Sequence, residues 1–172
     1  TYWDKNGRKI EEGYYSLNGV PKGNWSFWDK KGRKRLGKKI KYETFTNKDA
    51  IKHLDGYFLV YNQGNNLKNI YSQAHGSIRK GLQNGLWTYW DNEGNLLEHR
   101  NYKYGIISGA YSYYHINGNK LKNGKVKGSN ENGDMIMDGN WSFWNEDGSL
   151  IEEVEYSNGL RNGITKYFSS DG

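Results

Sequence analysis

The stretch GNWSFWDKKG at residues 23–32 returns with few changes as GNWSFWNEDG at residues 139–148. In both copies a glycine is followed by aromatic residues at the second, fourth and fifth positions, and by another glycine at the ninth. Side chains alternate along a strand, so the second and fourth positions share one face and the fifth lies on the other. An Asp or Asn that opens a four-residue segment closed by Gly is typical of a tight turn. The stretch therefore predicts a strand that runs into a turn.

The same frame recurs along the chain, which makes the stretch part of a repeat. With the first glycine as position 0, copies start at Gly23, Gly85, Gly109, Gly139 and Gly163, a weaker copy starts at Gly56, and a truncated copy starts near residue 1. We expect one strand from position 0 to about +6 and a second from about +10 to +17 in each copy, which together form a β-hairpin. A lone hairpin cannot bury its aromatic residues, but hairpins stacked in series can.

These repeats predict an all-β fold. We expect residues 1–172 to form one domain, an elongated array of antiparallel β-hairpins in a single sheet or a solenoid-like arrangement. The composition agrees, because 15 Tyr, 7 Trp and 23 Gly against one Pro favour strands joined by tight turns. The sequence begins and ends inside repeat copies, so we expect flanking residues or a pairing partner at both ends.

One segment departs from the hairpin pattern. In TNKDAIKHLDG at residues 46–56, Thr46 and Asp49 have the spacing of a helix capping box, and Ile51 and Leu54 are three residues apart. This pattern predicts one short helix near residues 47–54. The spacing of the repeat is also irregular at residues 118–138, where we expect a longer hairpin or loop.

The full pattern of Gly-x-Trp-x-Tyr/Phe-Trp-x-x-x-Gly followed by Tyr-x-x-Gly resembles MORN repeats. Among MORN repeats, the bacterial variant is the most similar. The similarity is clearest in NGLWTYWDNEGNLLEHRNYKYG at residues 84–105 and in the copy that starts at Gly139. The resemblance implies arrays of antiparallel hairpins that act as non-catalytic binding or scaffold modules. It also implies antitoxin or immunity proteins as relatives, and acidic phospholipids or protein assemblies as partners.

The aromatic residues at the fifth position are the first candidate interaction surface. Their strand neighbours at the first and third positions are mostly small or polar, so this face could be open to a protein partner or to a carbohydrate that stacks on the rings. Burial in a thin sheet is the alternative. The candidate residues are Trp28, Tyr61, Trp90, Tyr114, Trp144 and Phe168.

A basic strand is the second candidate. Residues 1–48 hold 13 Lys and Arg against 5 Asp and Glu, and many of these cations lie in KKGRKRLGKKIK at residues 30–41. As a strand, this segment would place Arg33, Arg35, Lys39 and Lys41 on one face. Such a face could bind an anionic membrane or a nucleic acid. The alternative is a solvated edge strand that uses its charges to block pairing.

The sequence contains no motif that predicts catalysis. The absence of cysteine excludes disulfides, thiol chemistry and cysteine-bound metal. The four histidines lack metal-binding spacing, so we expect no metal, no cofactor and no enzymatic activity. No run of about 18 apolar residues predicts a membrane span, and the compartment and oligomeric state stay open. The sequence thus predicts a scaffold that binds a protein, of the antitoxin or immunity type, with binding of an anionic surface or a carbohydrate as alternatives.

Overall fold

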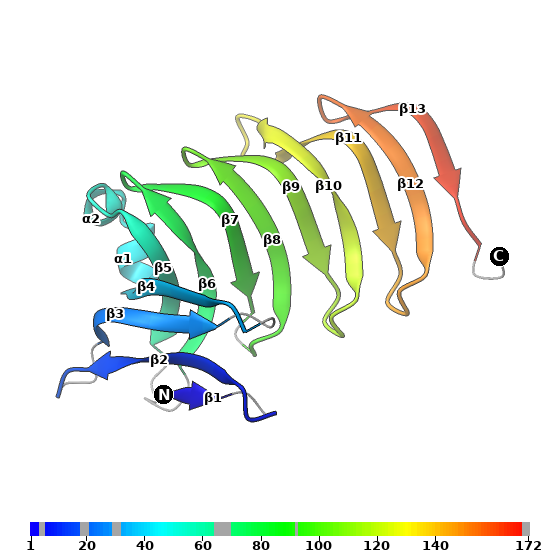
Figure 1. The fold of residues 1–172 in the computed structure, drawn as a ribbon. Coiled ribbons are helices and arrows are strands. Elements are labelled where there is room, and N and C mark those ends of the chain that lie inside the picture. Colours follow the sequence, from blue (N-terminus) through cyan, green and yellow to red (C-terminus); the bar gives the residue numbers. More distant parts are fainter. Residues whose placement is uncertain (4–5, 18–20, 29–31, 64–69, 92, 170–172) are drawn as a thin grey trace. The chain divides into compact units, whose positions relative to one another are not determined.

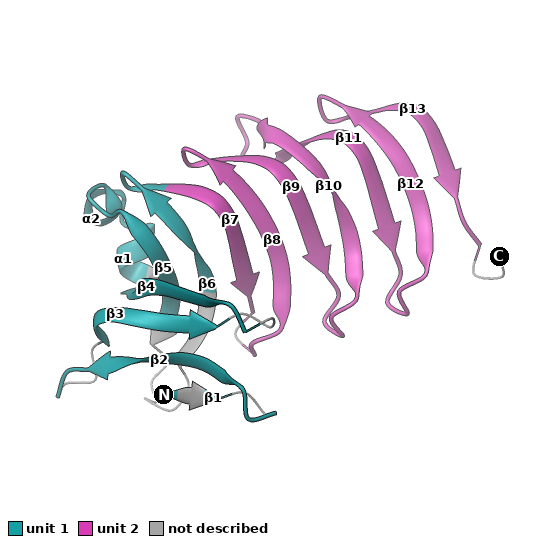
Figure 2. Ribbon diagram, in the orientation of Figure 1, with its two compact units in different colours: residues 1–82 teal, residues 83–172 magenta. Residues whose placement is uncertain are grey.

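The computed structural model describes residues 1–3, 6–17, 21–28, 32–63, 70–91 and 93–169. The chain divides into two compact units, unit 1 (residues 1–82) and unit 2 (residues 83–172), which are coloured separately in Figure 2. This division neither confirms nor refutes the prediction of one array over residues 1–172. Both units are built mainly of strands, so the predicted all-β class is confirmed.

Unit 2 is an open, single-layer sheet of hairpins. Its strands follow one another in chain order and each pairs with its neighbour in antiparallel fashion, as Figure 1 shows. They are β7 (Leu82–Trp90), β8 (Leu96–Lys103), β9 (Ile106–Tyr114), β10 (Lys120–Ser129), β11 (Met135–Trp144), β12 (Leu150–Ser157) and β13 (Leu160–Tyr167). The predicted arrangement of antiparallel hairpins is confirmed here.

Two kinds of turn alternate along unit 2. The turns that close the repeated stretch end on a left-handed glycine, as at Gly118 and Gly148, where φ is 89° and 92°. Each of these glycines donates its N–H to the carbonyl three residues earlier. Two of the other turns have two residues each, Tyr104–Gly105 and Asn158–Gly159, all with positive φ. That geometry is the type I′ turn, whose twist matches that of the flanking strands.

The hairpin of β10 and β11 is longer than the others. Each strand has ten residues, and residues 130–134 form the turn where the neighbouring hairpins use two residues. This confirms the longer hairpin that the irregular spacing predicted. The extension carries Met135 and Met137 beyond the regular sheet pattern, and both become part of the site described below.

In unit 2 the position-0 glycines of β9, β11 and β13 bend their strands. Gly109 has φ 101° and lies where one residue of β8, Asn101, faces three residues of β9, between the pairs Tyr102–Ile107 and Arg100–Tyr111. Such a β-bulge kinks the strand and increases its twist, and glycine adopts the left-handed conformation at no steric cost. In unit 2 the first strands begin three or four residues before this glycine, earlier than the predicted start at about position 0. In unit 1 the strand of the copy at Gly23 begins at Pro21, and that of the copy at Gly56 begins at Gly56 itself, as predicted.

The second and fourth positions of the repeat form the core row of unit 2. Trp87, Tyr111 and Trp141 are buried, and Tyr113 and Phe143 pack beside them. The ring of Trp141 covers Gly124 on the preceding strand, where a β-carbon would collide with the indole. Its Nε1 donates to the carbonyl of Lys125 at 3.0 Å. Glycine on the neighbouring strand therefore makes room for a flat ring that lies along the sheet.

Unit 1 combines hairpins with a parallel crossover. Its strands are β1 (Tyr2–Trp3), β2 (Lys9–Tyr15), β3 (Pro21–Trp28), β4 (Lys34–Lys41), β5 (Gly56–Gln63) and β6 (Ile70–Arg79). β4 and β5 pair in parallel, while the other neighbours in this unit are antiparallel. Parallel neighbours need a connection that crosses the sheet, and two short helices provide it here.

The crossover holds two helices, where the sequence predicted one. They are α1 (Tyr42–Thr46) and α2 (Lys48–Ile51), and α1 contacts both β4 and β5. The predicted capping box is wrong, because Asn47 caps α2 by accepting hydrogen bonds from the N–H groups of Asp49 and Ala50. Asn47 breaks the backbone between the two helices with an extended φ and ψ.

The crossover also inverts the faces of the repeat. Trp25 and Phe27 cluster with Leu59 and Tyr61 on one face. The parallel register places Lys41 opposite Tyr61, so the fifth position of the copy that starts at Gly56 lies on the same face as the second and fourth positions of the copy before it. Hairpin repetition alone would not produce this change of side.

Candidate binding surfaces

The aromatic residues at the fifth position do not form one open row. Tyr61 is only 3% exposed and belongs to the core of unit 1, which corrects its prediction as a surface residue. The physical reason is the parallel crossover, which turns this side chain under Trp25 and Phe27. The others differ in exposure: Trp28, Trp90, Tyr114 and Trp144 are half-buried, and Phe168 is exposed.

Neighbouring polar side chains cover the half-buried rings. Lys9 and Lys34 place their Nζ atoms 5.2 and 5.4 Å from the centre of the Trp28 ring. Lys120 lies 5.5 Å from the ring centre of Trp144, and His99 meets Tyr114 edge to face at 5.4 Å. These contacts give the rings a structural role. The interaction role predicted for them stays a prediction.

The predicted basic strand is β4, but its four candidate cations are not equivalent. Arg33 and Arg35 are exposed and Lys41 is half-buried. The register pairs Arg35 with Phe27, so this side of β4 is the aromatic face of unit 1. Lys39 belongs to that interior, with a side chain that is 1% exposed. The prediction that Lys39 contributes to an open basic patch is therefore wrong.

Lys39 occupies a cage of aromatic and acidic groups. Its Nζ lies 2.7 Å from Glu11 Oε1, 3.2 Å from Tyr15 Oη and 4.2 Å from the centre of the Trp25 ring. Burial lowers the pKa of this ammonium group, and the carboxylate of Glu11 acts in the opposite direction. A paired and hydrogen-bonded cation of this kind is typical of a structural role.

A cleft of about 690 Å³ opens on the aromatic face of unit 2, the face that carries Trp87, Tyr111 and Trp141. Its walls are largely apolar, because Ile106 and Ile107 follow the β8–β9 turn and Met135 and Met137 come from the extended β10–β11 hairpin. Methionine side chains adapt to partners of different shape. The insertion that breaks the repeat thus builds one side of the cleft.

Arg100 and Tyr102 lie on the floor of the cleft and are held by a hydrogen-bond network. Arg100 pairs with the buried Glu98 at 2.5 Å, and Tyr111 Oη donates to Glu98 Oε2 at 2.9 Å. Burial alone would lower the pKa of Arg100, but hydrogen bonds to Glu98 and Tyr102 raise it. Burial and the adjacent carboxylate raise the pKa of Tyr111. The floor is therefore rigid and carries a permanently charged guanidinium group.

Lys122 supplies the second cation of the cleft. It lies on β10 between Tyr113 and Phe143 of the neighbouring strands, and its Nζ is 5.9 Å from the centre of the Tyr113 ring. Asp134 also lines the cleft, but neither it nor any other described carboxylate forms a salt bridge with Lys122. An apolar cleft with an uncompensated cation suits an acidic side chain flanked by apolar ones.

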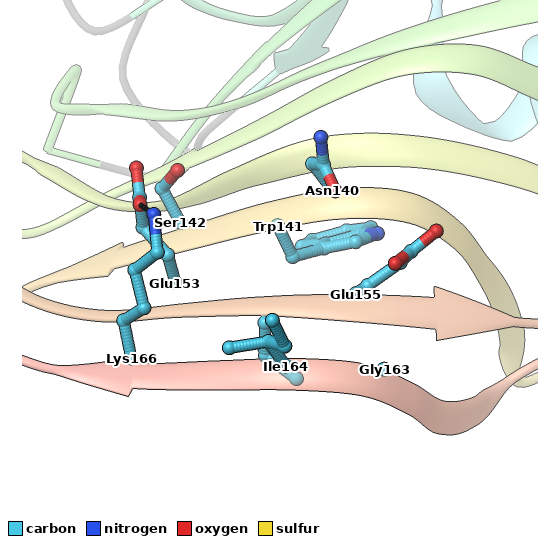
Figure 3. Close-up of a pocket in the computed structure, with 9 residues that line it drawn as sticks. Asn140, Trp141, Ser142, Glu153, Glu155, Gly163, Ile164 and Lys166 are labelled. Atoms are coloured by element: carbon cyan, nitrogen blue, oxygen red, sulfur yellow. Dashed lines mark ion pairs between the residues drawn. The ribbon is translucent and has the colours of Figure 1, made fainter.

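A smaller groove of about 330 Å³ lies on the opposite, polar face of unit 2. Figure 3 shows Glu153 and Glu155 of β12 beside Asn140 and Ser142 of β11, with Ile164 and Lys166 of β13 on the other side. Glu153 and Lys166 form an ion pair at 3.7 Å. Glu153 and Glu155 share this face, because they pair with Ser142 and Asn140, which alternate along β11.

Two further observations concern membranes and metals. Within the described ranges, neither helix is long enough to cross a membrane. The same residues contain no group of three or more His, Asp or Glu side chains arranged to hold a metal ion.

Comparison with known proteins leaves the family open. No model of a known protein family matches the chain, and no curated protein matches it. The resemblance to MORN repeats therefore stays a prediction that rests on the repeated residues themselves.

The sequence alone did not reveal the cleft. Arg100 and Lys122 are ordinary strand residues 22 positions apart, and only the antiparallel register brings them to one face. The one available signal was the interruption of the repeat at residues 118–138, which predicted a longer hairpin but not the cleft that it encloses.

Proposed function

We propose that the chain is a non-catalytic repeat scaffold that binds another protein through the aromatic-face cleft of unit 2. The observation that supports this most is the combination of apolar walls with Lys122, a cation that no described carboxylate neutralises. Burying an unpaired cation in a complex is unfavourable, so a partner must offer an anion there. The expected ligand is an exposed segment with Asp or Glu next to large apolar residues.

The resemblance to antitoxin and immunity proteins suggests a toxin as the partner. Masking a toxin requires a rigid surface, because ordering flexible groups on binding costs affinity. The network around Glu98 and Arg100 provides such rigidity on the cleft floor. An apolar contact of this kind is expected to survive salt concentrations that remove purely ionic binding.

A displayed random peptide library tests the proposal. Selection on the wild-type chain should enrich peptides in which an acidic residue adjoins aromatic or aliphatic ones, and the Lys122→Glu variant should lose them. Lys125→Glu is the matched control, because Lys125 lies on the same strand with its side chain on the opposite face. Equal binding by both variants, or no enrichment on the wild-type chain, contradicts the proposal.

A second candidate function is binding of an anionic polymer or surface by unit 1. Residues 1–82 hold 17 Lys and Arg against 7 Asp and Glu, a net charge of +10. Arg33 and Arg35 are exposed on this unit. Such binding should fall steeply with added salt. Replacing Arg33, Arg35 and Lys41 with Glu should abolish binding to single-stranded DNA or to vesicles of acidic lipid, and unchanged binding would exclude this function.

A further inference from the structure

We infer that this chain associates with a second copy of itself, head to tail, through two surfaces of opposite charge. The acidic surface is the polar-face groove of β12 and β13 in unit 2. The basic surface is the outer side of β4 in unit 1, which carries Lys34, Leu36 and Lys38. Neither surface includes the aromatic-face cleft, so the inference does not depend on the proposed function.

The acidic surface combines carboxylates with an exposed apolar side chain. Ile164 is 78% exposed and borders the groove between Glu153 and Glu155 (Figure 3). Glu153 is partly neutralised by Lys166 at 3.7 Å. Among the described residues, no cation forms a salt bridge with Glu155, which lies exposed at the edge of the groove.

Gly163 keeps the groove open beside Glu155. A β-carbon at this position would lie 2.7 Å from Glu155 Oε2, closer than such atoms approach each other. The glycine also has φ 89°. The bulge therefore holds the carboxylate against the backbone of β13 and leaves its outer side accessible to a cation.

The basic surface has the complementary order of side chains. Lys34, Leu36 and Lys38 alternate along β4 and share one side, because Leu36 pairs with Ser26 and Lys34 with Trp28. Leu36 is 64% exposed, and both lysines are exposed. Within the described part of the chain, neither lysine forms a salt bridge, although Lys34 lies near enough to Glu12 to contribute, after Lys9, to the lowered pKa of that carboxyl group.

The two surfaces match in charge and apolar content. Alternate side chains on one face of a strand are about 7 Å apart, so this distance separates Glu153 from Glu155, and about twice this distance separates Lys34 from Lys38. The two long lysine side chains must therefore converge from either side of Leu36 to reach the carboxylates while Leu36 meets Ile164. The net charges of the units have the same signs as the two surfaces, since residues 1–82 carry +10 and residues 83–172, with 8 Lys and Arg against 12 Asp and Glu, carry −4. This charge asymmetry within one chain favours a second copy as the occupant.

Because the two surfaces differ, the contact is heterologous. Each copy can then offer its acidic surface to one neighbour and its basic surface to another, which produces open chains or closed rings. Exposed ion pairs are individually weak and are screened by salt. The association should therefore be concentration-dependent and should weaken as ionic strength rises.

Sedimentation velocity of the 172-residue chain over a range of concentrations at low salt tests the inference. The wild-type chain should form larger species that dissociate in high salt. The variants Lys34→Glu/Lys38→Glu and Glu153→Lys/Glu155→Lys should each raise the apparent dissociation constant about tenfold or more. Lys48→Glu/Lys52→Glu, at the first residue of α2 and at its C-cap, is the control for the change in net charge, and it should associate as the wild-type chain does.

Mixing the two interface variants provides the decisive measurement. Each variant alone carries like charges on both surfaces, but the mixture pairs opposite charges again and should regain association. A wild-type chain that stays monomeric at every concentration overturns the inference. So does a mixture that fails to associate although both variants show wild-type circular dichroism, or an association that is the same in high salt, which would indicate another protein surface.

Discussion

The contact between Trp141 and Gly124 shows how a single glycine allows a large aromatic ring to be buried on a single-layer sheet. The indole lies flat over the glycine and is 1% exposed although only one layer of strands supports it. The same arrangement recurs in unit 1, where Trp25 covers Gly13. A glycine opposite the tryptophan is therefore part of the packing unit, and the aromatic residue compensates for the weak strand propensity of glycine.

Gly124→Ala should destabilise the protein. The added methyl group would collide with Trp141, and overpacking of this kind costs about 1–3 kcal/mol. Gly128→Ala is the matched control on the same strand, because a β-carbon there meets no atom within 4 Å. Urea denaturation measures both free energies of unfolding, and an equal loss in the two variants would contradict the packing argument.

The pair of Glu11 and Lys39 should behave as a buried ion pair. Glu11→Gln leaves the Lys39 ammonium group without its partner, which is expected to cost about 3–5 kcal/mol. The double variant Glu11→Leu/Lys39→Met should recover most of this loss because it removes both charges. Asp49→Asn breaks the exposed pair with Lys52 and should change stability by less than about 1 kcal/mol. A double variant less stable than Glu11→Gln would refute this account.

At the scale of elements, the two-residue turns make a direct comparison possible. Tyr104 and Asn158 occupy equivalent positions with φ of 52° and 51°. Asparagine tolerates the left-handed conformation, whereas tyrosine is strained there. Tyr104→Asn should therefore raise the free energy of unfolding by about 1 kcal/mol, and Asn158→Tyr should lower it similarly. Thermal unfolding of the two variants measures these changes. If the melting temperature shifts in the same direction in both variants, the left-handed conformation at this turn position does not determine the difference in stability.

The hairpins were predictable because their signals are local. The turn that ends at Gly148 and the alternation around Trp141 can be recognised within ten residues of sequence. The burial of Tyr61 was not predictable, since it depends on the parallel pairing of β4 with β5. That pairing accompanies the contacts of α1 with both strands, and the residues next to Tyr61 in the sequence give no sign of parallel pairing. The cleft beside Lys122 escaped prediction for the same reason, because it forms between strands and an extended hairpin.

At the scale of the whole molecule, buried tyrosines make the protein sensitive to alkali. Burial raises the pKa of four phenols, those of Tyr61, Tyr89, Tyr111 and Tyr114, above the usual value of 10.0. The folded state keeps these protons at a pH where the unfolded chain releases them, so stability should be constant below about pH 10 and fall above it. Lys39 has a lowered pKa and opposes this trend, but it is a single group.

Urea denaturation between pH 8 and 11 measures this dependence. Absorbance at 295 nm, which reports phenolate, should show that these tyrosines ionise together with unfolding. Stability that rises across this range would contradict the predicted effect of burial.

Unit 2 should fold without unit 1. The cluster of Ile107, Tyr111, Val126, Trp141 and Val154 is formed entirely by its own residues. A fragment of residues 83–172 should therefore unfold cooperatively and keep its tryptophans shielded from iodide. A fragment with the fluorescence of an unfolded chain would show that these contacts are insufficient. Mutation of Trp141 to Ala provides the comparison, because it removes the centre of the cluster.

The left-handed glycines also mark the positions at which whole hairpins can be added to or deleted from the chain. Gly85 and Gly109 are 24 residues apart and occupy equivalent positions in β7 and β9. Deleting the residues between them would join the first part of one strand to the second part of the other, with a glycine still at the bend. Recombination between such codons would change the number of hairpins while leaving each junction sterically intact. Variation in length along a lineage is thus expected in whole hairpins.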